Sequence, residues 1–458
     1  MIILTKTLVK QVEVVDLFSG CGGLALGFQE AGWHIGTGME LNQTAAITAS
    51  YNLHWKKGID HEHLCGDITE ADASIFSAGD NPIVIGGPPC QAYSLAGRAK
   101  LNSLGEDRKA INDSRGFLFE DFLRIAIEIN ARAVIMENVP ESVNYNGINI
   151  PEKVCEILEE KGYDAVWTIL NSADYGVPQI RERVFVMAIH KDFGKIASMP
   201  VPTHRKPDPN FKTINESRLP GLAANRHFRV PQIGGADLPL WITVGDALSD
   251  LPSLFPLANS PYKLYKPEMN LPYNKCPQNS YQELMRTSVN GPRQTVSGHG
   301  FRRTKRDFRI FEKMSYNDNY RDAHDIAMKI LANECNKRGI RAKTHPNQYE
   351  TLKKSIVPPY SIEKFLSKWK KLDPAKPSHT LVAHLSTDTY SHIHPWEPRG
   401  ISVREAARLQ SFPDDFYFNC SMTEAFKQIG NAVPPLLSKA VAQAIKKNLG
   451  GNKGESNE

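Results

Sequence analysis

The sequence predicts an α/β fold in which a doubly wound sheet carries a smaller inserted domain. Short β-branched runs alternate with segments of helical periodicity, and a glycine-rich turn separates the first strand from the first helix. A long middle region, rich in Pro, Gly and basic residues, departs from this pattern. The 458 residues suffice for two or three domains, and a hydrophobic content of 41% is ordinary for a globular protein.

Several classes of protein are not indicated. No apolar run approaches the ~18 residues of a membrane span, and Met1 to Lys10 lack the apolar core of a signal peptide. The seven cysteines are scattered and include no C-x-x-C pair, which indicates neither a disulfide framework nor a zinc site. We therefore expect a reducing, cytoplasmic location.

The net charge of +5 is unevenly distributed. Positions 191–390 hold 32 Lys and Arg against 18 Asp and Glu, so the rest of the chain is acidic. A mildly acidic body with a basic insert suggests an enzyme that carries a module for binding a polyanion. Chance segregation of solvated charge is the alternative.

The first predicted strand, Val12–Phe18, leads through a glycine turn into a helix over Leu24–Ala31. Gly20, Gly22 and Ala25 match the spacing of a dinucleotide-binding turn, in which glycine lets the backbone approach a ligand and the helix N-terminus offers free N–H groups. The pattern does not say which nucleotide binds.

Acidic residues follow two later segments. The predicted strand His34–Met39 ends at Glu40, about 20 residues after the glycines, where a carboxylate can accept hydrogen bonds from ribose hydroxyls. Asp67 could accept one from an adenine amino group. A helix N-cap or a loop charge is the alternative for each.

A predicted strand from Ile83 stops at a Gly-Gly-Pro-Pro turn that ends in Cys90. The prolines restrict the backbone, which suits a nucleophile that must meet its target at fixed range. A buried structural cysteine is the alternative. The polar loop 96–114 carries several basic residues and is expected to act as a lid.

Two further predicted strands bring polar groups toward Cys90. A helix over Phe117–Asn130 precedes the strand Arg132–Met136, which runs into Glu137 at the edge where open α/β sheets bind ligands. Arg181 and Arg183 lie two positions apart on an extended segment and should face the same side. They suit an anionic or carbonyl-rich ligand, with a structural salt bridge as the alternative.

The remaining predicted helices lie in the later part of the chain: Lys153–Lys161, Thr243–Leu251, Ile310–Arg338, Ser361–Leu372, Val403–Gln410 and Leu436–Asn448. Basic and aromatic residues mix between Phe301 and Arg309, as phosphate-backbone contacts often require. His392 and His394 are joined by no pattern of acids or thiols, and no metal site is predicted.

The ordered motifs resemble those of the DNA (cytosine-5) methyltransferases. They are DLFSGCGGLALGF (16–28), Glu40, GD (66–67), GGPPCQAYS (86–94), ENVP (137–140), DYGVPQIRERVF (174–185), RGISVREAARLQSFPDDF (399–416) and QIGNAVPP (428–435). They occur in the usual order of the family and cover about residues 10–190 and 396–447. The resemblance points to a prokaryotic enzyme of the restriction-modification type.

The resemblance implies a Rossmann-like methyltransferase domain over 1–192, completed by 396–447, with a target recognition domain over 193–395 and a polar tail over 448–458. It implies S-adenosylmethionine as the cofactor, bound by Phe18, Gly20, Gly22, Glu40, Asp67 and Asn431. It assigns catalysis to Cys90, Glu137, Asn138, Arg181 and Arg183. Contacts with DNA are expected from Gln91, Ser94, His384, Ser386, Thr387 and Asp388.

The implied reaction methylates C5 of a flipped cytosine in a specific sequence of double-stranded DNA, through a covalent bond between Cys90 and C6. We expect a monomer, with a cognate endonuclease acting on the same DNA site. The alternatives are a tRNA methyltransferase of the same family, an NAD-dependent oxidoreductase, and a DNA-binding regulator without activity. The oxidoreductase would leave Cys90, Glu137 and the two arginines without roles.

Overall fold

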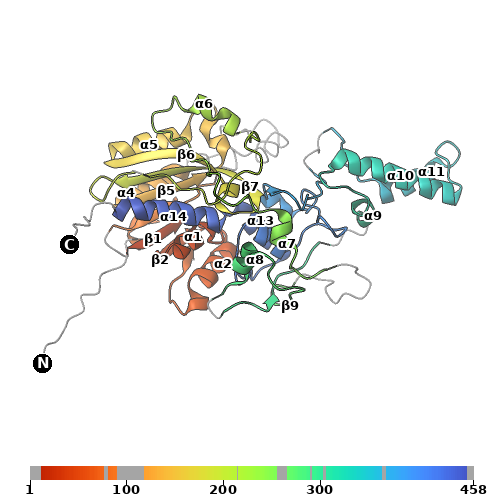
Figure 1. The fold of residues 1–458 in the computed structure, drawn as a ribbon, viewed down its shortest axis with the longest axis horizontal. Helices are drawn as coiled ribbons and strands as arrows, with labels where there is room; N and C mark the ends of the chain where they lie inside the picture. The colour runs from red at the N-terminus through yellow and green to blue at the C-terminus, as the bar shows by residue number, and fades with distance from the viewer. Residues whose placement is uncertain are drawn as a thin grey trace. The chain divides into compact units, whose positions relative to one another are not determined.

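The chain forms two compact units in a computed structural model: residues 1–241 with 432–458, and residues 242–431. The structure describes residues 12–76, 81–89, 118–196, 198–213, 215–254, 266–288, 291–302, 306–363 and 368–450. Figure 1 shows the sheet and helices of the first unit and the helices, short strands and long loops of the second unit.

A seven-stranded sheet in the order β3-β2-β1-β4-β5-β8-β6 forms the centre of the first unit. The first five strands of this order are mutually parallel, and β8 runs antiparallel to both of its neighbours. The order reverses between β1 and β4, which is the switch point of a doubly wound sheet. The expected fold class is therefore confirmed. The strands are β1 (Glu13–Leu17), β2 (His34–Glu40), β3 (His63–Cys65), β4 (Ile83–Gly86), β5 (Ala133–Asn138), β6 (Tyr163–Asn171) and β8 (Glu182–His190).

Helices cover both faces of this sheet because its central strands are apolar on both sides. α4 and α5 pack on one face in a common hydrophobic core. α1 packs closely against α14, since a Cβ added at Gly27 would lie 2.4 Å from Cβ of Ser438. The helices are α1 (Gly23–Glu30), α2 (Gln43–Leu53), α4 (Leu118–Glu128), α5 (Ile150–Glu160), α6 (Leu219–Leu222) and α14 (Pro435–Gly450), with short 3₁₀ turns at Trp55–Lys57, Ala73–Phe76, Pro140–Asn144, Ser172–Tyr175 and Glu216–Arg218.

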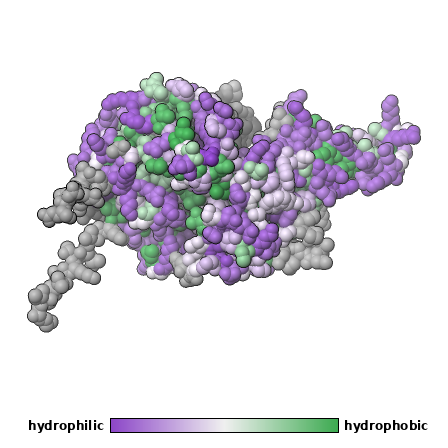
Figure 2. All heavy atoms as spheres, viewed as in Figure 1, coloured by the Kyte–Doolittle hydropathy of each residue, from purple (hydrophilic) through white to green (hydrophobic). Residues whose placement is uncertain are grey.

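The second unit contains short helices, two-residue strands and one long helix, α10, which packs against α9 and α11. Its elements are α7 (Val244–Leu248), β9 (Leu271–Pro272), α8 (Ser280–Arg286), β10 (Thr295–Val296), α9 (Phe308–Phe311), α10 (Tyr320–Arg338), α11 (Pro346–Ile356), β11 (Ser378–His379), a 3₁₀ turn η10 (Ala383–Ser386), α12 (Val403–Leu409) and α13 (Met422–Asn431). Hydrophilic residues dominate the visible surface over α10 and α11 (Figure 2). Among the described helices of both units, none combines the length and the apolar composition needed to cross a membrane.

Two helix predictions in the second unit are wrong in extent. The segment 310–338 is broken, because Asn317 adopts a left-handed φ of 68° and Asn319 caps a new helix by accepting from the N–H of Arg321 at 2.8 Å. The predicted helix Ser361–Leu372 is not helical in its described residues, where Trp369 has a φ of 59°. A helix forms earlier instead, with Pro346 in its first turn.

Buried ion pairs hold the second unit together around α12. Arg408 donates to Asp250 at 2.6 Å and to Asp414 at 2.6 Å, and all three side chains are inaccessible to solvent. Arg399 makes a similar pair with Glu405 at 2.7 Å. Arg399, Glu405, Arg408 and Asp414 of the RGISVREAARLQSFPDDF segment are thus paired inside this unit, and removing one partner would leave a buried unpaired charge, which commonly costs ~3–5 kcal/mol.

Candidate active site

The carboxyl ends of β1, β4 and β5 are neighbours in the sheet; the predicted cofactor turn follows β1, and predicted catalytic segments lie at the ends of β4 and β5. Cys90, Gln91, Ser94 and the loop 96–114 lie outside the described residues. The described chain continues through Gly87 to Pro89, and a Cβ added at Gly87 would lie 3.0 Å from Oε2 of Glu137. The turn that leads to Cys90 therefore begins beside the Glu137 carboxylate, and a side chain at position 87 would crowd it.

Glu137 and Arg183 form a buried ion pair at this edge. The Nε of Arg183 lies 2.9 Å from Oε1 of Glu137, and the two side chains are 11% and 12% exposed. Burial raises the pKa of Glu137, while the positive charges of Arg183 and Arg181 oppose the rise. The site thus holds a carboxyl group that accepts a proton more readily than a solvated glutamate does.

The other two predicted catalytic residues flank this pair. Asn138 is buried at the end of β5, and its side-chain oxygen accepts from the N–H of Val139 at 2.8 Å. Arg181 is buried and donates to the carbonyl oxygen of Ala432 at 3.0 Å. Desolvation lowers the pKa of Arg181, and the positive charge of the nearby Arg183 lowers it further.

The glycine turn after β1 has an unusual backbone. Phe18, Gly20 and Gly22 have φ values of 59°, 55° and 86°, which lie in the left-handed region. A Cβ at Gly22 would meet the side chain of Leu53 at 2.8 Å, so only glycine fits there without a shift. Glu40 holds this turn, because its Oε2 accepts from the N–H of Gly20 at 2.9 Å and its Oε1 from that of Asn42 at 2.8 Å.

The sequence analysis missed Asp16, which lies in β1 close to Glu40. Its side chain is only 1% exposed, and neither carboxylate oxygen has a hydrogen-bond partner among the described residues. Burial and the charge of Glu40 raise its pKa well above the usual range. A buried acid without a partner calls for an explanation. Two sequence signals were available: an acid near the end of an apolar strand, and the first position of the motif DLFSGCGGLALGF.

The last two predicted cofactor residues, Asp67 and Asn431, are both exposed to solvent. Asp67 is exposed, and its Oδ1 accepts from both the N–H and the hydroxyl of Thr69 at 3.0 and 2.8 Å. In the described structure Asp67 therefore closes a local turn with Thr69. Asn431 is exposed at the end of α13, in the second unit, one residue before Ala432.

The four predicted DNA-reading residues lie in and after the turn η10. His384 and Thr387 are exposed, while Ser386 and Asp388 are partly buried. The Ser386 carbonyl accepts from Arg302 at 2.8 Å, and Asp388 pairs with Lys368 at 2.7 Å. His384 and Thr387 are thus the more accessible candidates for contact with a base.

The two histidines that were considered as metal ligands have other roles. His392 is buried and stacks on His379 with ring centres 4.0 Å apart. Nδ1 of His394 accepts from the N–H groups of Trp396 and Glu397, and its Nε2 lies 3.5 Å from Glu405. These contacts belong to the interior of the second unit.

The first unit thus carries a glycine turn held by Glu40 and a buried acid–arginine pair at one edge of a doubly wound sheet. This arrangement is typical of Rossmann-like enzymes that bind a nucleotide cofactor beside the substrate. The chain belongs to the family of C-5 cytosine-specific DNA methylases, whose model matches residues 12–447. The resemblance found in the motifs is thereby confirmed.

Several curated relatives are similar along nearly their whole length. A protein of Oceanobacillus iheyensis named "Putative type II methyltransferase M.OihORF3336P" is 59% identical over 454 residues, covering 98% of each chain. Type II methyltransferase M.AgeI of Thalassovita gelatinovora is 29% identical, covering 95% of this chain and 99% of its own. A solved structure described as a "putative DNA modification methyltransferase encoded within prophage" of E. coli has a TM-score of 0.62 and 23% identity, covering 96% of this chain and 99% of that one. This likeness concerns the fold alone.

Proposed function

We propose that this protein transfers a methyl group from S-adenosylmethionine to C5 of a cytosine flipped out of double-stranded DNA, through a covalent bond between Cys90 and C6. The observation that carries the proposal is the buried ion pair of Glu137 and Arg183. Gly87 contacts the Glu137 carboxylate and lies three residues before Cys90 in the chain. Membership of the C-5 cytosine-specific DNA methylase family supports it.

The residues at the ends of β1 and β2 fit the proposed cofactor. Asp16 offers an unpartnered buried carboxylate to a cationic group such as the methionine ammonium, and Glu40 is placed to meet the ribose hydroxyls. Gly20 and Gly22 keep the turn free of side chains, and Phe18 packs beside the adenine. Asp67 and Asn431 complete the set in this proposal. When bound, S-adenosylmethionine supplies a methyl group that is already activated by its sulfonium.

On the cytosine side, the difficulty is that C5 is a weak nucleophile. The Cys90 thiolate adds to C6, and the electron pair of the C5–C6 double bond becomes available at C5. Glu137 donates a proton to N3, a role that its raised pKa favours, and it also accepts from the exocyclic amine. Arg183 orients Glu137, Arg181 contacts O2, and Asn138 fixes the adjoining backbone.

The covalent step must then be reversed. After C5 has taken the methyl group, it loses its proton to a base, and the electron pair of the C–H bond re-forms the double bond as the Cys90 thiolate leaves C6. N3 returns its proton to Glu137. The enzyme is regenerated and 5-methylcytosine remains in the DNA. Because C6 is inaccessible within the stacked duplex, the base must leave the helix first.

The segment 193–395 is proposed as the target recognition domain. It carries an excess of Lys and Arg over Asp and Glu, and the phosphates of duplex DNA attract this positive charge. His384, Ser386, Thr387 and Asp388 are the proposed base contacts, with Gln91 and Ser94 on the catalytic side. The names of the relatives as type II methyltransferases also favour double-stranded DNA as the substrate and a cognate endonuclease as a functional partner.

Expression of the protein in a host that lacks cytosine methylation, followed by bisulfite sequencing of plasmid DNA, tests the proposal. We expect 5-methylcytosine in one sequence context, absent with Cys90→Ala and retained with the exposed-cysteine control Cys276→Ala. Methylation of transfer RNA alone would favour the tRNA alternative. Full methylation by Cys90→Ala would contradict the covalent mechanism.

A further inference from the structure

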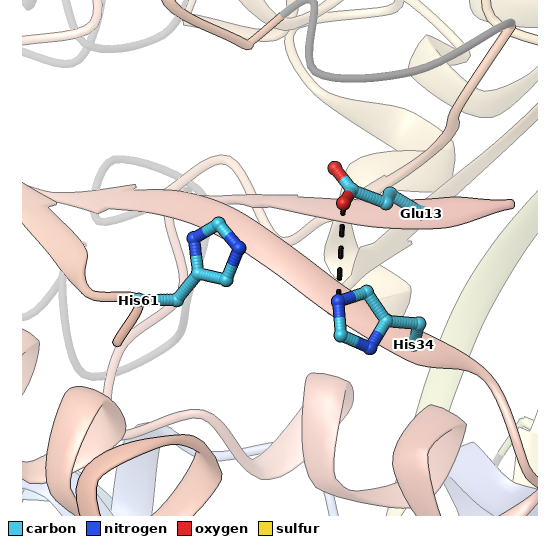
Figure 3. Close-up of side chains that lie close together, drawn as sticks. All are labelled: Glu13, His34 and His61. Atoms are coloured by element: carbon cyan, nitrogen blue, oxygen red, sulfur yellow. Dashed lines mark ion pairs between the residues drawn. The ribbon is translucent and has the colours of Figure 1, made fainter. Parts of the chain in front are cut away.

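We propose that Glu13, His34 and His61 form a binding site for a divalent transition-metal ion of the Zn²⁺ type. One ligand atom of each residue lies within 4.8 Å of the other two. Figure 3 shows His34 and Glu13 side by side on neighbouring strands, with His61 directed toward them from the segment before β3. The sequence predicted no metal site, because 21 and 27 residues separate these positions along the chain.

Strand pairing brings two of the ligands together. Glu13 and His34 are register partners in β1 and β2, and Nε2 of His34 lies 3.8 Å from Oε1 of Glu13. This distance exceeds the range of a hydrogen bond. Ligand atoms on one tetrahedral Zn²⁺ lie about 3.3 Å apart, given metal–ligand bonds of about 2.0–2.1 Å. All three side chains are partly exposed, so small side-chain rotations would bring their atoms to this spacing.

The surroundings supply a second observation that points to a ligand. His54 and His63 are 0% and 3% exposed, and none of their four ring nitrogens has a hydrogen-bond partner among the described residues. The ring centre of His54 lies 5.9 Å from that of His61 and 5.5 Å from that of His63. Buried polar groups are normally satisfied. His54, which lies beside His61, and His63 therefore have the capacity for further polar partners in this region, such as a cation or ordered water.

The glycine at position 36 also makes room for the proposed carboxylate ligand. A Cβ at Gly36 would lie 2.9 Å from Oε2 of Glu13, and this oxygen is buried without a hydrogen-bond partner. Any larger residue would press on the carboxylate. Oε2 is thus held against Gly36, while Oε1 is the oxygen that faces His34.

The donor set selects the class of ion. Two imidazoles and one carboxylate suit Zn²⁺, and three protein ligands leave a fourth position for water. The site lies where β1 and β2 begin, whereas the candidate active site lies where the strands end. A bound ion would join β1, β2 and the segment before β3, so its role is to stabilise the sheet and not to take part in methyl transfer.

Metal titration of the full-length protein tests this site. The protein is purified without a histidine tag, stripped with a chelator and titrated with Zn²⁺ by calorimetry. We expect one equivalent to bind with a Kd below about 10 µM and to raise the melting temperature. Co²⁺ should give the visible absorption of tetrahedral coordination. No binding by the wild-type protein would overturn the proposal.

Variants locate the ion. His61→Ala and Glu13→Gln should each weaken binding at least about tenfold. His324→Gln is the matched control, since His324 lies 3.9 Å from Asp325 in a histidine–acid pair outside the cluster. Circular dichroism of the metal-free variants checks that they are folded, and His61 is partly exposed, which makes its replacement mild. Unchanged zinc binding by both folded cluster variants, or its loss in His324→Gln, would place the ion elsewhere and overturn the proposal.

Discussion

Replacing Glu137 by glutamine isolates the proton that this carboxyl group is proposed to carry. The amide keeps the size of the side chain and one oxygen that can accept from Nε of Arg183, which now lies 2.9 Å from the carboxylate. It cannot exchange a proton with N3 of cytosine. General acid–base catalysis contributes about 10²- to 10⁴-fold in rate, which corresponds to roughly 3–5 kcal/mol in the activation barrier.

The same change should affect folding much less. Stripping one partner from a buried ion pair typically costs ~3–5 kcal/mol. Here part of that cost is offset, because the raised pKa shows that desolvation already opposes the charge of Glu137. We therefore expect the free energy of unfolding to fall by less than about 3 kcal/mol, with the affinity for S-adenosylmethionine unchanged.

Single-turnover methylation of a saturating DNA duplex measures the effect directly. Glu182→Gln is the matched control, because Glu182 neighbours Arg183 in β8 but contacts Thr213 and Asn215 instead. A rate for Glu137→Gln within tenfold of the wild-type rate would refute the proposed role. So would an equal loss in the control, since that would indicate a general disturbance of β8.

Three other predictions follow from the contacts and charges. Glu40→Gln should weaken binding of S-adenosylmethionine about 10- to 100-fold in calorimetry, because its amide NH₂ would face the N–H of Gly20 or Asn42; unchanged affinity would contradict this. Affinity for duplex DNA should fall about 10³-fold between 50 and 200 mM salt if six phosphates are contacted, and a flat salt response would exclude the basic segment as the DNA-binding module. Burial raises the pKa of Asp174 to about 6, so the folded protein favours the protonated side chain. The contribution of Asp174 to the free energy of unfolding is therefore fully present below pH ~4 and lost as the pH rises through 6. Asp174→Asn should therefore be more stable than wild type by up to about 3 kcal/mol at pH 7.5 and no more stable near pH 4, as urea unfolding would show.

The parts of the fold that the sequence predicted well are those specified by local pattern. The strand–glycine–helix opening and the strand before Glu137 depend on neighbouring residues, and the structure reproduces both within a few residues. The break at Asn319 was missed because helical periodicity continues across it while a polar cap overrides it. β6 was missed as well; it is almost wholly buried, so it shows no clear alternation along its length.

The parts that could not be predicted depend on contacts between distant residues. Asp16 became a candidate ligand only once its burial and its lack of a partner were visible. Asp250 and Arg408 form a buried pair across 158 positions, and no local signal links them. Likewise, the Glu13–His34 contact requires the register of β1 against β2. A one-residue change in that register would point one of the two side chains to the opposite face of the sheet.

The strand β1 contributes a residue to the proposed metal site and another to the proposed cofactor site. Glu13 lies near its start and Asp16 near its end, about 10 Å apart at ~3.3 Å per residue. The carboxyl end must leave polar groups unsatisfied so that ligands can pair with them, and this costs stability. An ion that tied the amino ends together would offset part of that cost without occupying the edge where the chemistry takes place. Stability and reactivity would then be placed at opposite ends of the same strand.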